Sequence, residues 1–211
     1  DAKVLNRMKI RYFLISTLAF IASATFLKAQ LAMPLTFDEA MEFTFTDFGP
    51  DLEGGRPVDK VTNAVADPDN AENMVAGVIK PAGAETWSGV TFWDGTKVPV
   101  SESKTKISVR VRTLEANTPI LLKIENSLSP SHFVEKIVNS TKANEWEILT
   151  FDYANPTGGT LDFNELLPVY NRISIFFNFG AGGGASDTTY HFEDVTLGAP
   201  EILNLPFDFE S

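Results

Sequence analysis

The sequence contains no cysteine among its 211 residues. Disulfide bonds, thiol chemistry and cysteine-ligated metals are therefore excluded. Histidine is nearly absent as well, because His132 and His191 are the only two in the chain. They lie far apart in the sequence and form no His-rich metal motif. The fold must be stabilised by a hydrophobic core, with or without a bound ion.

Basic residues are also scarce, with 17 Lys and Arg against 28 Asp and Glu. Five of the basic residues and one of the acidic residues lie in residues 1–29, so the rest of the chain has 12 basic and 27 acidic residues. Binding to nucleic acid needs clustered Lys and Arg, which this acidic chain does not provide. Anionic polymers are disfavoured for the same reason, whereas neutral ligands and cations stay open as partners.

An apolar segment near the N-terminus has the pattern of a secretory signal peptide. Lys9 and Arg11 precede an almost uncharged stretch, Tyr12–Phe26, and the small residue Ala29 follows it. A basic start, an apolar stretch and a small residue at the cleavage position are the features of such peptides. The stretch is shorter than the about 20 apolar residues that a membrane-spanning helix needs. We expect cleavage after Ala29, and the alternative is an N-terminal anchor or a buried helix.

The expected domain order follows from this segment and from a short repeat. Residues 1–29 are interpreted as upstream residues plus the signal peptide, and residues 30–200 as one domain. Leu31–Asp38 is similar to Leu203–Glu210, with a proline, a phenylalanine and an acidic residue in register. We interpret residues 201–211 as a linker and the truncated start of a second, tandem repeat. Chance similarity between two strand starts is the alternative.

Alternation of apolar and polar residues predicts β-strands in the rest of the chain. Lys106–Arg112 is the clearest case, because its apolar residues are Ile107, Val109 and Val111. Further strands are expected at 119–125, 133–138, 146–153, 172–179 and 190–197. Gly- and Pro-rich turns separate these segments, and only Leu161–Tyr170 could form a helical turn or two. The pattern predicts an all-β fold, either a sandwich or a barrel.

Several segments together resemble a known family. They are Pro34–Asp38, Asp47–Gly49, Trp87–Gly89, Val109–Arg112, Pro119–Glu125, Trp146–Phe151 and Tyr190–Val195. In this order and spacing they resemble the jelly-roll carbohydrate-binding modules of secreted proteins from marine and gut Bacteroidetes, over residues 31–198. The Lys28–Gln30 ending also resembles signal peptides of that group.

The resemblance implies a two-sheet antiparallel β-sandwich (jelly roll) that binds a glycan without catalysis. It also implies, in many members, a structural calcium ion where the first and last strands meet. Such modules accompany glycoside hydrolases or belong to surface glycan-binding and adhesin proteins. We therefore expect a secreted or cell-surface module that is monomeric within a multidomain chain. No nucleic-acid partner is expected, and no membrane insertion after signal cleavage.

Catalysis is not expected in this part of the protein. Acidic residues are numerous, but no pair of carboxylates stands out by its sequence context. No serine lies in a Gly-x-Ser-x-Gly motif. A catalytic domain, if the protein has one, is expected in a part of the chain beyond this sequence.

Two tryptophans are the first candidates for a sugar-binding site. Stacking on a pyranose needs an exposed aromatic ring, and Trp87 and Trp93 would share one face of an uninterrupted strand. Outward polar residues that could reach the hydroxyl groups of a sugar are Arg110, Arg112, Lys123, Glu125 and Asn178. The alternative is that these residues form the solvated side of the sandwich and that Trp87 is core. We assign Trp146 to the core, with Ile148 and Thr150 on its face.

A structural calcium ion is the expected cofactor. Calcium needs several hard oxygen ligands, usually carboxylates and carbonyls. Asp38 and Asp194 lie near the two ends of the domain, and the terminal strands of a jelly roll are neighbours. Residues that could assist are Glu39, Asp59 and Glu193, and Asp67–Asn73 is a second acidic loop. An acidic cluster without a metal is the alternative.

The function predicted from the sequence is non-catalytic binding of a neutral polysaccharide, and charge and habitat suggest a β-glucan. The alternatives are a structural spacer or adhesin repeat, and an accessory domain of a glycoside hydrolase. Exposure of Trp87 and Trp93 would distinguish a glycan-binding module from a structural spacer, because a spacer has no reason to expose two indoles.

Overall fold

The described part of the chain contains eleven β-strands and loops that connect them. The computed structural model describes residues 32–37, 46–48, 60–71, 73–164 and 169–199. The strands are β1 (Thr46–Phe48), β2 (Lys60–Ala66), β3 (Met74–Lys80), β4 (Gly89–Asp94), β5 (Lys106–Arg112), β6 (Pro119–Asn126), β7 (Ser129–Asn139), β8 (Trp146–Asp152), β9 (Gly158–Gly159), β10 (Arg172–Phe177) and β11 (Thr188–Leu197). Within these ranges no helix occurs, and so none that could cross a membrane.

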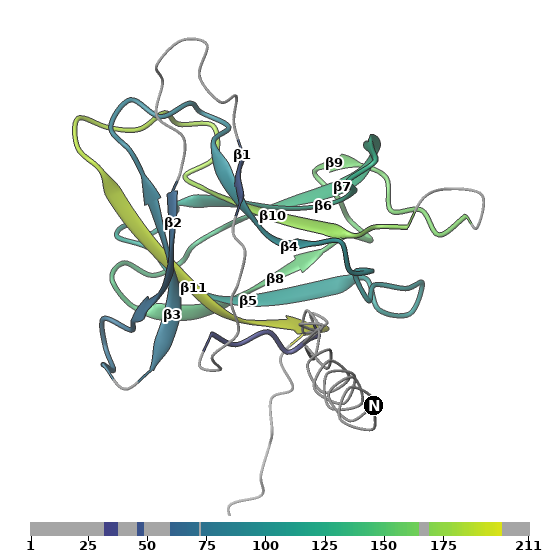
Figure 1. Cartoon of the computed structure of the whole chain (residues 1–211), viewed down its shortest axis with the longest axis horizontal. Coiled ribbons are helices and arrows are strands. Elements are labelled where there is room, and N and C mark those ends of the chain that lie inside the picture. Colours follow the sequence, from purple (N-terminus) through teal and green to yellow (C-terminus); the bar gives the residue numbers. More distant parts are fainter. Residues whose placement is uncertain (1–31, 38–45, 49–59, 72, 165–168, 200–211) are drawn as a thin grey trace, which may run out of the picture.

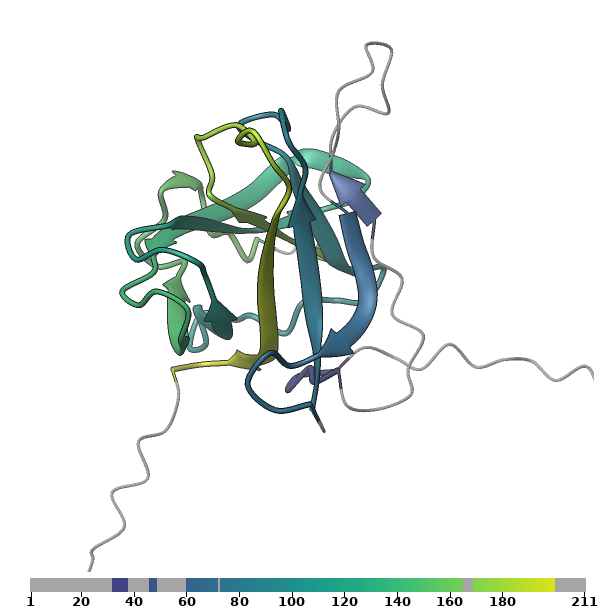
Figure 2. The ribbon, with the colours of Figure 1, turned by 90° about the vertical axis from the view of Figure 1, so that its left-hand side faces the viewer.

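The strands form two antiparallel sheets that pack face to face. The first sheet has six strands in the order β1-β4-β10-β6-β7-β9, and the second has five in the order β2-β3-β11-β5-β8. Figure 1 shows β4, β10, β6 and β7 together in the first sheet. Figure 2 shows β2, β3 and β11 side by side in the second. The predicted two-sheet β-sandwich of the jelly-roll type is confirmed.

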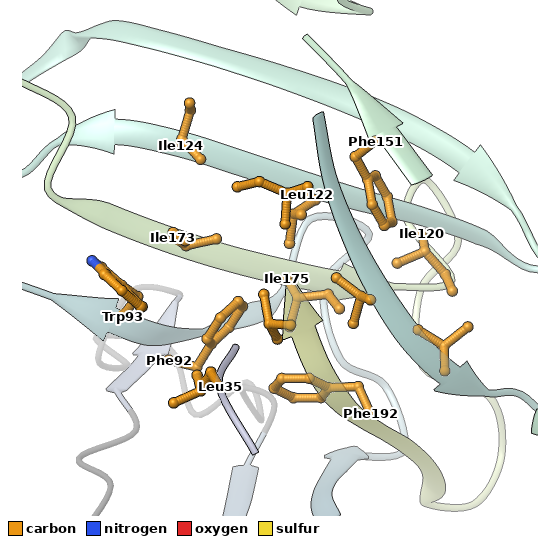
Figure 3. Close-up of a cluster of buried hydrophobic side chains, with 14 of the residues drawn as sticks. Leu35, Phe92, Trp93, Ile120, Leu122, Ile124, Phe151, Ile173, Ile175 and Phe192 are labelled. Atoms are coloured by element: carbon orange, nitrogen blue, oxygen red, sulfur yellow. The ribbon is translucent and has the colours of Figure 1, made fainter. Parts of the chain in front are cut away.

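The core lies between the two sheets and is built from alternate residues of each strand. Ile107, Val109 and Val111 of β5 are fully buried and face the core, as their alternation predicted. Leu122 and Ile124 of β6 reach it from the other sheet, as Figure 3 shows. Because side chains alternate along a strand, the residues between these point to the outer face of their own sheet. Each sheet therefore has one outer face, and the two outer faces lie on opposite sides of the sandwich.

Six strands lie where the sequence predicted them. β5 has the predicted bounds, and β6, β7, β8, β10 and β11 overlap the predicted segments. β2 and β3 were not predicted because alanine, glycine and asparagine interrupt their alternation. Residues 161–164 and 169–170, from the segment with helical potential, are not helical. The signal peptide and the second repeat lie outside the described residues, so these and the domain bounds stay predictions.

Candidate functional site

The outer face of the six-stranded sheet carries a connected set of polar and charged side chains. We call it the six-stranded face and define it by Thr91, Asp94, Lys123, Glu125, Phe133, Glu135, Arg172 and Ser174. The strand register places Arg172 of β10 between Asp94 of β4 and Glu125 of β6. Three neighbouring strands therefore bring charges of both signs into one row.

Ion pairs hold the side chains of this row. Arg172 donates two parallel hydrogen bonds to Asp94, from Nε and Nη2, each 3.2 Å long. Its Nη1 also donates to Glu125 Oε1 at 3.5 Å, and Glu125 Oε2 lies 2.6 Å from Lys123 Nζ. Burial by itself would lower the pKa of Arg172. The hydrogen bonds and the negative charges of Asp94 and Glu125 have the larger effect, so the pKa of Arg172 is raised. The row is a fixed chain of alternating charges.

Two hydroxyl groups lie beside this row. Thr91 and Ser174 face each other across β4 and β10, and their hydroxyl oxygens are 2.7 Å apart in a hydrogen bond. Thr91 is 4% exposed, Ser174 1% and Glu125 2%, although all three lie on the outer face of the sheet. Polar residues on an outer face are ordinarily solvent-exposed. These three instead form a polar floor on the six-stranded face.

Aromatic rings border the polar floor. Lys123 Nζ lies 4.8 Å from the centre of the Phe133 ring, within cation–π range. Glu135 lies opposite Lys123 on β7, and its pKa is raised by burial and by Glu125, with Lys123 acting in the other direction. Phe176 lies over β4 at Gly89, where any side chain would clash with its ring. Charged groups, hydroxyls and rings thus meet on one face.

Arg110 and Arg112 lie on the opposite side of the molecule. Both alternate with the core residues of β5, so they point to the outer face of the five-stranded sheet. Lys123 and Glu125 belong to the six-stranded face, and the core separates the two sets. These four outward residues therefore cannot all belong to one binding face, although each was predicted as a candidate to reach the sugar. Strand alternation identified outward residues correctly but did not say to which sheet each strand belongs.

Arg110 belongs to a hydrogen-bonded cluster, which we call the Arg110 network. It forms an ion pair with Glu193, and its guanidinium lies 4.4 Å from the centre of a Trp146 ring. Asn73 Nδ2 donates to Glu193 Oε2 at 2.9 Å and to Asp67 Oδ2 at 3.3 Å. Trp146 Nε1 donates to Asp67 Oδ1 at 3.0 Å. These contacts tie the loop after β2 to β5, β8 and β11.

In the acidic loop Asp67–Asn73, groups of the protein itself contact the carboxylates of Asp67 and Asp69. Burial opposes ionisation of Asp67, but hydrogen bonds from the Asp69 N–H, Trp146 and Asn73 outweigh burial and lower the pKa of Asp67. Arg112 Nε lies 3.5 Å from Asp69 Oδ2. The carboxylates are thus engaged by donors and cations of the protein itself. Among the described residues, no group of three or more acidic or histidine side chains could hold a metal.

Two of the three tryptophans, Trp93 and Trp146, differ from their predicted roles. Trp93 is 1% exposed, lies in the core and donates from Nε1 to Thr96 O at 2.7 Å, so it offers no ring to a ligand (Figure 3). Trp87 is 38% exposed, in the turn that precedes β4. Trp146 is not core, because it shares the outer face of β8 with Ile148, which is 51% exposed. The prediction placed Trp146 and Ile148 on one face correctly but chose the wrong side.

The remaining predicted residues lie at the ends of strands. Asn178 follows β10 in a left-handed conformation, with φ 49°, and its carbonyl lies 3.4 Å from Lys80 Nζ. It is not one of the residues of the six-stranded face. Asp194 lies at an irregularity of β11 and also has a positive φ, 48°. Asp38, Glu39 and Asp59 lie outside the described residues, so the calcium pair is untested.

Sequence reasoning named only Lys123 and Glu125 of the eight residues that define the six-stranded face. Arg172 and Ser174 alternate with apolar residues in a predicted strand, so their outward orientation could have been found. Asp94 and Thr91 lie in a segment that was not among the predicted strands. Their meeting with Arg172 and Ser174 depends on the register between β4 and β10, and this register includes an irregularity that no sequence pattern indicates.

Comparisons with known proteins agree with this fold. No family model and no curated protein matches the sequence. A solved structure from a study of the promiscuous specificity of carbohydrate-binding modules of the β-sandwich superfamily aligns with a TM-score of 0.51 and 11% identity, over 81% of this chain and 64% of its own. The family 11 carbohydrate-binding module of a cellulosomal cellulase of Clostridium thermocellum aligns with a TM-score of 0.47 and 14% identity, over 80% and 94%.

This chain thus spans less than two thirds of the length of the first of these structures. At 11% identity, the likeness concerns the fold alone. The chain has a β-sandwich fold of the kind that carbohydrate-binding modules have.

Proposed function

We propose that this domain binds a neutral polysaccharide on the six-stranded face and catalyses no reaction. The observation that carries this proposal is the row Asp94, Arg172, Glu125 and Lys123, in which each charge is paired with its neighbour. Paired charges add little net charge to a ligand site. They still present carboxylate acceptors and cationic donors side by side, and a sugar hydroxyl can both donate and accept.

The charge of the whole chain supports a neutral ligand. Acidic residues exceed basic residues by 11, which disfavours anionic polymers. Asp94 and Arg172, whose side chains are 45% and 26% exposed, suit a hydroxyl-rich ligand, because their ion pair supplies hydrogen-bonding groups at fixed positions. A β-glucan is the ligand class that we propose. Trp87, the one exposed indole among the predicted sugar platforms, is proposed to stack on the sugar at the end of the sheet.

The proposed context is a larger secreted or cell-surface protein of a Bacteroidetes bacterium. Its support is the signal-peptide pattern between Lys9 and Ala29, whose Lys28–Gln30 ending resembles that group, and the partial repeat at Leu203–Glu210. The module is proposed to act as a monomer within a tandem array, beside other domains. An accessory role for a glycoside hydrolase fits the same module.

A structural spacer is the second candidate function. The observation in its favour is the Arg110 network, in which outward polar residues are engaged with each other rather than presented to a ligand. Burial of Trp93 also favours it, since only Trp87 of the two predicted platforms is exposed. A spacer would bind no glycan at all.

The test is binding of the whole chain to an array of neutral glycans, followed by affinity electrophoresis in gels that contain the best polysaccharide. Lys123→Ala is expected to weaken retention about tenfold or more, because a hydrogen bond to a charged group contributes about 1.5–3 kcal/mol. Lys106→Ala is the matched control, since Lys106 pairs with Asp152 on the other sheet at 3.9 Å. Its retention should equal that of the unmodified chain.

Either of two results would contradict the proposal. If no neutral glycan binds, the spacer function stands in its place. If Lys106→Ala and Lys123→Ala weaken retention equally while both chains stay folded, the six-stranded face is not the site.

We further propose that Asp38 and Asp194 bind a structural calcium ion. Hydrogen bonds in both directions between Leu35 and Val195, 2.8 and 3.0 Å long, place the N-terminal segment beside the end of β11. An ion at 100 times its Kd would stabilise the fold by about 2.7 kcal/mol, or about 5–10 °C in Tm.

EDTA is expected to lower Tm by this amount, and Asp194→Ala is expected to abolish this sensitivity to EDTA. Glu145→Ala, an exposed acidic control, should keep it. An identical Tm with and without EDTA would overturn the proposal.

A further inference from the structure

The last residues of β11 have an edge that β3 does not cover. β3 pairs with β11 only up to Phe192, five residues before the end of β11. Beyond this point Leu35 and Val195 exchange both backbone hydrogen bonds, 2.8 and 3.0 Å long. Figures 1 and 2 show residues 32–37, in purple, beside the end of β11. We call the edge at Val195, with the buried positions of Leu35 and Phe37, the β11 slot.

Every second side chain of residues 32–37 packs into the slot. Leu35 is 3% exposed and Phe37 2%, and Met33 packs against the same core (Figure 3 shows Leu35). The rings of Phe37 and Phe192 meet edge to face, with centroids 5.4 Å apart and planes at 87°. The residues between them are exposed or half-buried. The slot thus recognises a strand by its backbone and by apolar side chains at alternate positions, as sheet edges that bind peptides do.

A second segment of the chain has the same alternation. Its apolar residues stand at every second position, and they are Leu203, Leu205, Phe207 and Phe209. In the repeat, Phe207 matches Leu35 and Phe209 matches Phe37. Phe207 has both the N–H and the C=O that Leu35 uses in the slot. Residues 203–209 lie outside the described ranges, so the match is one of sequence.

The direction and the length of the chain allow this second segment to reach the slot. Residues 32–37 run antiparallel to β11. A chain that folds back after Leu197 enters the slot in the same direction, as the second strand of a hairpin does. Residues 198–206 connect the two, and this length spans about 30 Å when extended, more than a hairpin connection needs. Because the pairing is intramolecular, the effective concentration of the segment at the slot is high.

We propose that the β11 slot is a docking site for Leu203–Phe209 of the same chain, which competes there with residues 32–37. The ring of Phe207 is larger than Leu35, and this difference favours residues 32–37 as the usual occupant. In a longer chain with further modules, such docking would join a module to the preceding one by strand pairing. The slot lies on the five-stranded sheet, so the proposal does not depend on sugar binding at the six-stranded face.

A double-mutant cycle on the whole chain, with Tm measured by circular dichroism, tests the proposal. Phe37→Ala weakens residues 32–37 in the slot, and the second segment is then expected to replace them and to limit the loss of Tm. Phe209→Asp alone is expected to leave Tm unchanged, because residues 32–37 still fill the slot. The double variant is expected to lose at least about 5 °C more than the two single variants together.

Trp93→Ala is the matched control. Trp93 is also a buried aromatic residue, 1% exposed, but it lies on β4 and has no counterpart in the second segment. Phe209→Asp is therefore expected to add nothing to the loss of Tm that Trp93→Ala causes. Leu35→Ala combined with Phe207→Asp forms a second cycle, which tests the slot if Phe37→Ala does not fold.

A peptide identifies the occupant directly. A synthetic peptide of residues 201–211 is expected to raise the Tm of the Phe37→Ala, Phe209→Asp chain and to shift the amide signal of Val195 in NMR. The same peptide with Phe207→Asp and Phe209→Asp should do neither, because it places a charge at both buried positions.

Three results would overturn the proposal. Additive losses of Tm in both cycles would show that the second segment does not enter the slot. Equal effects of the two peptides, or amide shifts that leave out Val195, would show that the apolar positions are not recognised there. A Tm of Phe37→Ala that rises with protein concentration, together with dimers in sedimentation, would show that a second copy supplies the segment instead of the same chain.

Discussion

Replacing Trp93 by alanine is expected to lower the free energy of unfolding by about 3–5 kcal/mol, the usual cost of truncating a buried aromatic residue. Trp93 is 1% exposed and lies in the core cluster, among residues of both sheets (Figure 3). The substitution removes the ring, leaves a cavity and deprives Thr96 O of a 2.7 Å hydrogen bond. Denaturant unfolding of the whole chain, followed by intrinsic fluorescence and circular dichroism, measures the loss.

Trp87→Ala is the matched substitution. Because Trp87 is 38% exposed, its loss is expected to leave the free energy of unfolding nearly unchanged. If Trp87 stacks on a sugar, the same variant should weaken retention in a polysaccharide gel several-fold. An unfolding midpoint of Trp93→Ala equal to that of the unmodified chain would show that Trp93 is not part of the core.

The contrast between the two residues shows what the sequence could and could not reveal. Trp87 and Trp93 were placed on one face on the assumption of an uninterrupted strand. A turn from Glu85 to Ser88, closed by a 3.2 Å hydrogen bond, separates Trp87 from β4. Within β4 an irregular register opposite β10 lets both Phe92 and Trp93 face the core. Neither the turn nor the irregularity has a clear signal in the sequence.

Strand positions were more predictable than strand partners. Alternation in Lys106–Arg112 gave the bounds of β5 and the orientation of each residue in it, because a half-buried strand exposes every second side chain. Which sheet a strand joins depends on contacts between distant segments. β5 and β6 are consecutive but lie in different sheets, so outward residues of the two, Arg110 and Lys123, ended on opposite sides of the molecule.

Glu193→Ala is expected to destabilise the domain strongly, by about 2–4 kcal/mol. Glu193 is 2% exposed and accepts from Arg110 and from Asn73. Removing one partner of a buried ion pair costs about 3–5 kcal/mol, because the other charge stays behind unpaired. The Arg110 side chain is 30% exposed and can reach water, which reduces that cost. Thermal and denaturant unfolding of the whole chain measure the effect.

The matched control for this variant is Glu145→Ala, which removes the same side chain from an exposed ion pair. Glu145 and Lys142 are 3.5 Å apart, with side chains 70% and 47% exposed, and such pairs contribute little to stability. No measurable change in stability is therefore expected for Glu145→Ala.

Arg110→Ala should reduce stability as Glu193→Ala does, because Arg110 contacts Glu193 and Trp146. Its retention by polysaccharide, measured below the melting transition, should equal that of the unmodified chain. Loss of retention with unchanged stability would show that Arg110 is part of the binding site and would overturn the structural role of the Arg110 network.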